Sequence, residues 1–348
     1  MAVLFLDGCG HLSAAHIPTK YDVTSNYTSG DVSAASTTGR FGTACYTFPN
    51  GATRGTVLGK QVSASSYLGV GVHQYCGFFP NNTRTCLELF DDTACAVASL
   101  RGSYASLLLF VSGNVTCAAS ANSAIGLNDW NLIELEASWA ASAVIRAYVC
   151  GVLVLSYAGA AVNPTASAFA QARWGVALLD GSTRMDDAYV INNASGGLST
   201  LASASLRIRE HYGIADTATA SWTPSTGASH WSMLNEASGV ATGHDSNVTY
   251  ISAPTTGARD LFSLAVATGV YSAFEQPKAV QLTAAALYVS GTTTLTLIYN
   301  GSGTVRSGVA CATSSTYQIH TYVFNSAAAN VSWTASAIDT LLIGVDAI

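Results

Sequence analysis

The chain has 348 residues, of which 10% are charged and 49% hydrophobic, and its formal net charge is −6. A typical soluble domain has about 25% charged residues, so this surface must consist largely of uncharged polar and small side chains. The negative charge and the three lysines, Lys20, Lys60 and Lys278, exclude a nucleic-acid-binding protein, which needs clustered cations to neutralise phosphates.

The N-terminal segment and the apolar runs give no sign of a membrane partner. The first residues, MAVLFLDG, have no basic segment and no cleavage site, so they predict a strand that ends in an Asp-Gly turn rather than a signal peptide. The longest apolar runs, such as residues 107–111 and 152–155, have the length of strands. A helix that crosses a bilayer needs about 20 apolar residues.

Seven of the eight cysteines lie in the first half of the chain, and none forms a CxxC pair. This pattern disfavours a zinc ribbon or a thioredoxin-type site. Two interpretations stay open, namely buried thiols that act as small hydrophobic groups and disulfides formed after release into an oxidising medium. The thiols that could form disulfides within or between subunits are Cys150, Cys9, Cys45 and Cys311.

Residues 132–139 are the clearest strand of the first half. Side chains alternate between the two faces of a strand. The alternation separates two sets, Ile133, Leu135, Ala137 and Trp139 on one face and Leu132, Glu134, Glu136 and Ser138 on the other. We therefore expect the first set to cover a core and the second set to meet solvent or a groove, with a solvated face as the leading interpretation for the two glutamates.

The next element is a hairpin over residues 144–157, with Cys150 and Gly151 at its turn. A primed two-residue turn needs positive φ at both central residues, so Cys150 is an unusual occupant and the best candidate for an accessible thiol. Two further strands, 174–179 and 185–191, flank an Asp-Gly turn. Residues 192–205 are rich in Asn, Gly, Ser and Ala and read as a linker, which predicts domains over 1–198 and 199–348.

The second half repeats the β pattern. Strands are expected over residues 261–266, 279–289, 293–299, 317–324 and 340–345, with a hairpin turn at 300–303. About eight short strands without a long amphipathic helix favour a jelly-roll-like sandwich. The expected fold class is therefore all-β, with two β-sandwich domains.

Several motifs resemble one family. The segments NDWNLIEL at 128–135, YVCGV at 148–152 and MDDAYV at 185–190 are similar to the concanavalin-A-like, or laminin-G-like, sandwich of tailed-phage and prophage virion proteins. The segments WTPSTG at 222–227 and GARDLF at 257–262 resemble the module that often follows it. Cys150 stands where that family usually has Asn, which leaves the redox state open.

The resemblance implies a structural component of a tailed-phage virion, in the neck or collar, in the head decoration or in a tail appendage. Such a protein would be assembled in the host cytoplasm and released in the particle. Its partners would be other virion proteins and further copies of itself, since symmetric assemblies bury complementary patches. The resemblance implies no reaction, so the chain is expected not to be an enzyme and to need no cofactor or metal.

Two acidic pairs could contradict that expectation. Glu134 and Glu136 share a strand face, as the paired carboxylates of glycosidases do, but the third carboxylate of the sandwich glycosidases is missing after Glu136. Asp186 and Asp187 could bind Ca²⁺ together with Asp180, yet few other acidic residues lie nearby. No catalytic, cofactor-binding or metal-binding residue is therefore assigned.

Aromatic residues support an alternative function. A cluster of rings precedes and follows the loop at residues 80–82, and it comprises Tyr67, Tyr75, Phe78, Phe79 and Tyr104. Exposed rings of this kind suit stacking against sugars, although rings are more often part of a core. The alternative is a carbohydrate- or receptor-binding module of a phage fibre or appendage, with a host surface glycan as its partner.

Overall fold

The computed structural model describes residues 2–9, 17–25, 33–35, 39–40, 45–48, 57–76, 84–91, 96–103, 107–112, 115–121, 124–138, 142–160, 168–175, 183–192, 208–209, 211–227, 229–234, 249–264, 277–287, 294–301, 303–327 and 331–348. The chain divides into two compact units, Met1–Ile208 and Arg209–Ile348. The domain boundary expected between residues 198 and 199 lies outside the described residues.

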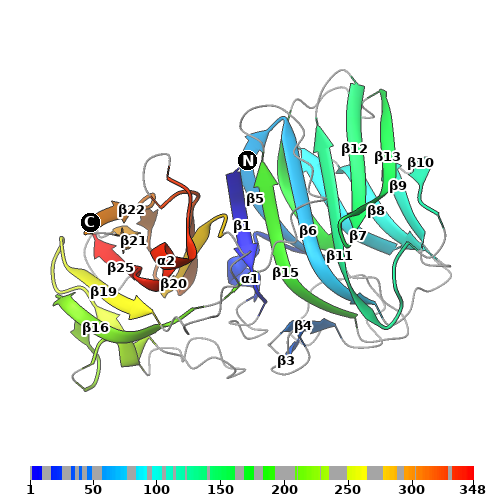
Figure 1. Cartoon of the computed structure of the whole chain (residues 1–348). Coiled ribbons are helices and arrows are strands. Elements are labelled where there is room, and N and C mark those ends of the chain that lie inside the picture. Colours follow the sequence, from blue (N-terminus) through cyan, green and yellow to red (C-terminus); the bar gives the residue numbers. More distant parts are fainter. Residues whose placement is uncertain are drawn as a thin grey trace. The chain divides into compact units, whose positions relative to one another are not determined.

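The first unit is built from two antiparallel sheets (Figure 1). Sheet A has the strand order β13-β12-β11-β6-β15-β4-β3, and β1 pairs with β15. Its strands are β1 (Ala2–Asp7), β3 (Ser33–Ala35), β4 (Cys45–Phe48), β6 (Tyr67–Cys76), β11 (Asp129–Ser138), β12 (Ser142–Val149), β13 (Val152–Ala160) and β15 (Thr183–Asn192).

Sheet B has the order β10-β9-β8-β7-β14-β5-β2. Its strands are β2 (Val23–Ser25), β5 (Val57–Ser65), β7 (Arg84–Asp91), β8 (Ala96–Ser103), β9 (Leu107–Ser112), β10 (Val115–Ala119) and β14 (Phe169–Gly175). A short helix, α1 (Ile17–Lys20), lies between β1 and β2 in the chain.

The core of the first unit lies between the two sheets. Ile133 and Leu135 of β11 are fully buried in one cluster with Leu87 of β7 and Trp174 of β14. The indole of Trp174 also donates a hydrogen bond of 3.1 Å to the carbonyl of Gly71 on β6, which ties sheet B to sheet A. The alternation expected in this strand is thus confirmed on its core face, although Trp139 lies outside the described residues.

The β12–β13 turn is the expected primed turn. Cys150 has φ 50° and Gly151 has φ 80°. Cys150 is exposed, as predicted, and its N–H donates to the carbonyl of Leu132 at 2.8 Å. Of the other three candidate thiols, Cys9 and Cys45 are buried and Cys311 is half-buried.

The second unit is a smaller sandwich. Its main sheet has the order β16-β19-β25-β21-β22, with β23 beside β21, and two-stranded sheets are formed by β17 with β18 and by β20 with β24. The elements are β16 (Gly213–Ala220), β17 (Thr223–Pro224), η4 (Trp231–Met233), β18 (Ile251–Ser252), β19 (Arg259–Leu264), β20 (Val280–Ala286), β21 (Thr294–Gly301), β22 (Thr304–Ser307), β23 (Cys311–Ala312), β24 (Gln318–Phe324), α2 (Ala335–Asp339) and β25 (Leu342–Ala347).

Its core joins the two layers, because Leu282 of β20 and Phe324 of β24 are buried in one cluster with Leu297 and Tyr299 of β21. The all-β class with two sandwiches is therefore confirmed. No helix within the described ranges combines the length and apolar character needed to span a membrane.

Candidate functional site

Polar and aromatic side chains from four neighbouring strands share the face of sheet A that points away from sheet B. Alternation puts them there, because their neighbours along each strand point into the core. β12, β11, β6 and β15 lie side by side in one layer (Figure 1). We call this surface the outer face; its members are Tyr67, His73 and Tyr75 of β6, Trp130, Glu134 and Glu136 of β11, Arg146 and Tyr148 of β12, and Arg184, Asp186, Asp187 and Tyr189 of β15.

Glu136 lies at the centre of a complete hydrogen-bond network. Its Oε2 accepts from the hydroxyl of Tyr67 at 2.9 Å, and its Oε1 accepts from the hydroxyl of Tyr148 at 2.9 Å and from Arg146 at 3.3 Å. Burial, together with the hydrogen bond to Glu136 and its charge, raises the pKa of Tyr148 to about 12. The Arg146 side chain is 30% exposed while Glu136 is fully buried, so a cation lies between the carboxylate and solvent.

Glu134 has an incomplete set of partners. Its Oε1 accepts a hydrogen bond from Tyr189, whereas its Oε2 is buried and has no hydrogen-bond partner in the described part of the chain. Burial raises the pKa of Glu134 to about 8; the bond from Tyr189 opposes this rise and the charge of Glu136 adds to it. At pH 7 Glu134 is therefore mainly a neutral acid.

The solvated strand face expected for Glu134 and Glu136 is wrong, since both side chains are fully buried. Bulky neighbours explain the difference. Tyr189 reaches across β6 to Glu134, and its ring lies so close to Gly71 that a Cβ at this glycine would overlap it. Tyr67 and Tyr148, both also buried, cover Glu136 in the same way.

A second set of buried polar groups surrounds His73, which lies further along β6. Its Nδ1 is 3.3 Å from Oδ2 of Asp187 and 3.4 Å from the guanidinium of Arg40. Its Nε2 is buried without a hydrogen-bond partner among the described residues. Burial lowers the pKa of His73, an effect that Asp187 opposes.

Asp186 and Asp187 form a β-bulge against β6, and Asp187 has φ 50°. Their oxygens accept backbone N–H groups, because Asp186 binds the amides of Arg40 at 3.2 Å and of Asp187 at 2.9 Å, and Asp187 binds the amide of Ile208 at 3.0 Å. Within the described ranges no group of three or more His, Cys, Asp or Glu side chains could hold a metal ion, and Asp180 lies outside those ranges.

An aromatic pair lies on the same two strands. Tyr75 and Trp130 meet edge to face with ring centroids 5.9 Å apart, and the guanidinium of Arg184 lies 4.8 Å from the centroid of Tyr75. All three are half-buried and so offer a partly open surface. Of the aromatic candidates from the sequence, Tyr67 and Tyr75 lie on the outer face, and Phe78, Phe79 and Tyr104 lie outside the described residues.

Sequence reasoning missed several members of the outer face, among them His73, Arg146, Tyr148 and Tyr189. The alternation of β6 could have grouped His73 with Tyr67 and Tyr75. Only the strand pairing brings the others together, since it places Glu134 opposite Tyr148 and Glu136 opposite Arg146.

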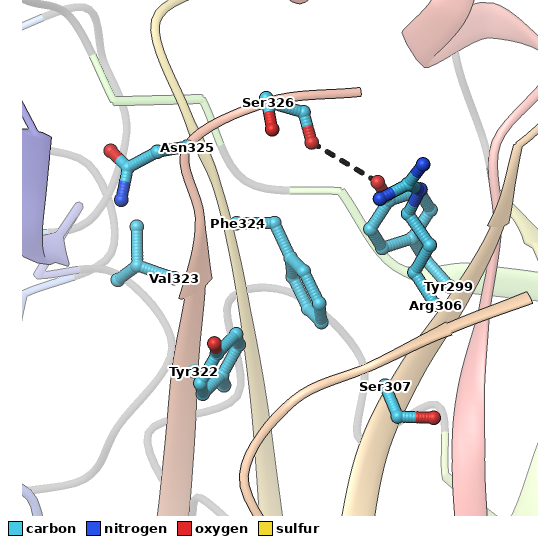
Figure 2. A pocket seen from close by; sticks show the side chains of 8 residues that line it. All are labelled: Tyr299, Arg306, Ser307, Tyr322, Val323, Phe324, Asn325 and Ser326. Carbon is cyan, nitrogen blue, oxygen red and sulfur yellow. Dashed lines mark hydrogen bonds between the residues drawn. The ribbon is translucent and has the colours of Figure 1, made fainter. Parts of the chain in front are cut away.

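The second unit offers two weaker candidates. Nδ1 of His230 lies 2.5 Å from Oδ2 of Asp260, whose other oxygen accepts the backbone amides of Ser221 and Trp222. A pocket opens between β21, β22 and β24 (Figure 2), and its lining residues are Tyr299, Arg306, Ser307, Tyr322, Val323, Phe324, Asn325 and Ser326.

The hydroxyl of Tyr299 at this pocket donates to the carbonyl of Ser326 at 3.1 Å, which is the bond drawn in Figure 2. Arg306 is the one charged residue among these eight described residues. The outer face of sheet A therefore gathers more convergent polar groups than either feature of the second unit.

No protein-family model and no curated protein matches the chain. Solved structures similar to it include the cellulose-induced protein Cip1, with 14% identity over 46% of this chain and 84% of that one and a TM-score of 0.36. The alginate lyase Aly36B has 10% identity over 53% of this chain and 92% of its own, with a TM-score of 0.39. A Trypanosoma rangeli sialidase has 12% identity over 47% of this chain and 28% of its own, with a TM-score of 0.33.

These similarities correct one expectation. The alginate lyase and the sialidase are enzymes, so the inference that this chain is not an enzyme is wrong as an inference from its fold and motifs. The reason is general, because one fold hosts many activities and function depends on the site. None of the three proteins named here is described as a virion protein.

Proposed function

We propose that the first unit binds a carbohydrate on the outer face of sheet A. The observation that carries the proposal is the grouping of hydroxyl, carboxyl, guanidinium and aromatic side chains from four adjacent strands on one face. Sugars present both hydroxyl groups and apolar C–H surfaces, so they suit sites that combine polar groups with rings.

The proposal is supported by the fact that neighbouring groups hold two of these side chains in place. Arg146 and Arg40, each with about 30% of its side chain exposed, are held by the buried carboxylates of Glu136 and Asp187. Their guanidinium groups can donate to a ligand without a large loss of side-chain entropy. Trp130 and Tyr75 add a half-buried aromatic surface at the other end of the same strands.

A glycan array probed with the purified chain tests the proposal, followed by calorimetry on the glycans that bind. Trp130→Ala should weaken binding about tenfold, the loss expected from 1.4 kcal/mol of stacking. Tyr250→Ala is the matched control, because Tyr250 is an aromatic residue of the second unit that is 42% exposed. Failure of the unmodified chain to bind any glycan would reject the proposal.

A second proposal concerns assembly and keeps the resemblance to tailed-phage virion proteins. The observation that favours it is the start of β13, an edge strand of sheet A, where Val152 is 64% and Leu153 50% exposed. Exposed apolar groups at a sheet edge favour contact with another chain, and we propose a further copy of this protein in a particle. Sedimentation should show self-association that Leu153→Asp reduces, and imaging of intact particles would give the position.

A further inference from the structure

The pocket of the second unit has a volume of about 310 Å³ (Figure 2). Small-molecule sites usually measure about 300–1,000 Å³, so this pocket has room for one group of the size of a sugar ring. It lies where the two layers of the sandwich meet, since Tyr299 and Arg306 belong to the main sheet and Tyr322 belongs to the sheet of β20 and β24. Its lining combines a guanidinium group with aromatic rings, hydroxyl groups and an amide.

Arg306 lies on the core-facing side of β22, an edge strand of the main sheet. The register places it opposite Tyr299, and residues opposite each other in an antiparallel pair share a face of the sheet. Tyr299 is fully buried in the core of the unit, so Arg306 lies on the side of the sheet that faces β24. Burial raises the pKa of Tyr299 and the charge of Arg306 opposes this rise, which is consistent with a guanidinium group close to that hydroxyl.

The guanidinium of Arg306 has no carboxylate partner among the described residues, whereas Arg259 of the same unit pairs with Asp346 at 2.5 Å. An unpaired guanidinium at a pocket favours an anionic ligand, because Arg donates two parallel hydrogen bonds to a carboxylate. One positive charge balances one negative charge, while a phosphate ester carries about two at pH 7. The lining therefore favours a carboxylate.

The aromatic wall of the pocket is held in place by its neighbours. The rings of Tyr322 and Phe324 have centroids 4.7 Å apart. The Tyr322 ring also lies so close to Gly308 that a Cβ at this glycine would come within 2.6 Å of its Cγ. Tyr322 is half-buried, so part of its side chain stays accessible, and an aromatic ring offers an apolar surface for the C–H groups of a sugar.

The polar wall follows the end of β24. The hydroxyl of Tyr299 donates to the carbonyls of Ser326 at 3.1 Å and of Ala327 at 2.8 Å, which fixes this segment. Asn325 and Ser326 line the pocket, as does Ser307 of β22. Amide and hydroxyl side chains both donate and accept hydrogen bonds, and the hydroxyl groups of a sugar require both.

We propose that this pocket binds one acidic sugar residue, a uronic acid, whose carboxylate pairs with Arg306 and whose ring packs on Tyr322. The site uses no residue of the outer face of sheet A, so it is a second site beyond the carbohydrate-binding function proposed above. An acidic side chain of a protein would offer the carboxylate without the ring, and it would leave the Tyr322 surface uncovered.

Ligand-observed NMR with the purified chain tests the proposal. The probes are the methyl glycosides of glucuronic, galacturonic and mannuronic acid, each beside the methyl glycoside of its neutral hexose. N-acetylglutamate methylamide supplies a carboxylate without a sugar ring. At least one uronic acid glycoside should bind, and its neutral counterpart should bind about tenfold more weakly, because it lacks the carboxylate for a charge-assisted hydrogen bond.

Substitutions locate the carboxylate. Arg306→Gln should lower the affinity for the uronic acid glycoside to that of the neutral glycoside. Arg306→Lys should recover only part of the affinity, since Lys keeps the charge but not the paired donors. Arg209→Gln removes a cation of the same unit that does not line the pocket, so it is the matched control and should leave binding unchanged. Arg306 is half-exposed on an edge strand, so denaturant unfolding should show that each variant stays folded.

The outcomes separate this inference from the function proposed for the first unit. Equal binding of acidic and neutral glycosides, or binding that Arg306→Gln leaves unchanged, would overturn the inference. Tight binding of N-acetylglutamate methylamide, equal to that of the best glycoside, would overturn the choice of a sugar. Loss of uronic acid binding in Trp130→Ala but not in Arg306→Gln would assign it to the outer face and overturn the second site.

An arginine on the inner side of an edge strand has one other known role, because an inward-pointing charge prevents the edge from pairing with another sheet. If no uronic acid glycoside binds, the inference fails whatever the outer face binds. Self-association of Arg306→Gln, measured by sedimentation, would then assign Arg306 to this protective role.

Discussion

Two buried polar clusters of the first unit differ in how completely their hydrogen bonds are made. Asp7 accepts at Oδ1 from Lys20 and from the amide of Cys9, both at 2.8 Å. It accepts at Oδ2 from the hydroxyls of Tyr21 at 2.6 Å and Tyr46 at 3.2 Å. We call this the Asp7 cluster; both oxygens of its carboxylate are satisfied, although Asp7 and Lys20 are only 1% exposed.

On the outer face Glu134 and His73 are just as buried as Asp7, but Oε2 of Glu134 and Nε2 of His73 find no hydrogen-bond partner within the described ranges. Burial alone therefore does not distinguish the two clusters. Completeness does, since a satisfied network stabilises the fold and an unpaired buried group is costly. The contrast therefore favours the outer face over the Asp7 cluster as the place of the proposed binding.

The largest expected effect tests the structural role of the Asp7 cluster. Asp7→Asn removes the charge that compensates Lys20, and breaking a buried ion pair costs about 3–5 kcal/mol. Denaturant unfolding measures the loss. The double variant Asp7→Asn with Lys20→Met is the control, and it should recover part of the lost stability because it removes both charges and keeps an amide oxygen as acceptor for the hydroxyls of Tyr21 and Tyr46. A single variant within about 1 kcal/mol of the unmodified chain would contradict the assignment.

The next prediction concerns the pH dependence of stability at Glu134. Its pKa is raised from 4.5 to about 8 by folding, so the native state retains a proton that the unfolded state releases. The stabilisation is present below pH 4.5 and is lost as pH rises to about 8. At about 1.4 kcal/mol per pKa unit, the loss between pH 5 and pH 8 is on the order of 4 kcal/mol.

Unfolding free energies at pH 5 and pH 8.5 should therefore differ more for the unmodified chain than for Glu134→Gln, which has no proton to release. The difference between the two chains isolates this group from all others that titrate. Equal slopes for both chains would show that Glu134 is ionised in the folded state, and the contrast between the two clusters would then disappear.

A smaller effect is expected at Gly71. A Cβ at this position overlaps the Tyr189 ring, and overpacking of a tight contact costs about 1–3 kcal/mol. Gly71→Ala should displace the ring and weaken the bond from Tyr189 to Glu134. Besides the lower stability, glycan binding should weaken, whereas Gly126→Ala, whose nearest contact would be at 3.4 Å, should affect neither.

Local sequence patterns predicted part of this site. The rest depends on contacts between residues that lie far apart in the chain, and these could not be predicted. Period-two alternation put Glu134 and Glu136 on one face, and the turn chemistry of Cys150 and Gly151 predicted the β12–β13 hairpin. The partners of the two glutamates come from pairings across long stretches of chain. No local signal links β6 with β15, so the positions of Tyr189 and Gly71 could not be read from the sequence.

Burial was the other point at which sequence reasoning failed. Glutamates are almost never fully buried unless they are paired, which is why the solvated face was expected. The pairing depends on Tyr67, Tyr148 and Arg146, and each lies on a neighbouring strand whose register had to be known first.

The smallest expected effect compares the same substitution in the two clusters. Tyr21→Phe removes one of two donors to Oδ2 of Asp7, deep in the core, and should cost about 1–2 kcal/mol. Tyr148→Phe removes one of two donors to Oε1 of Glu136, which keeps the charged donor Arg146, and should cost less than about 1 kcal/mol. Denaturant unfolding of both variants at pH 7 makes the comparison. A larger loss at Tyr148 would mean that the outer face stabilises the fold as strongly as the core does. The buried atoms of Glu134 and His73 that lack hydrogen bonds would then no longer favour the outer face as the binding site.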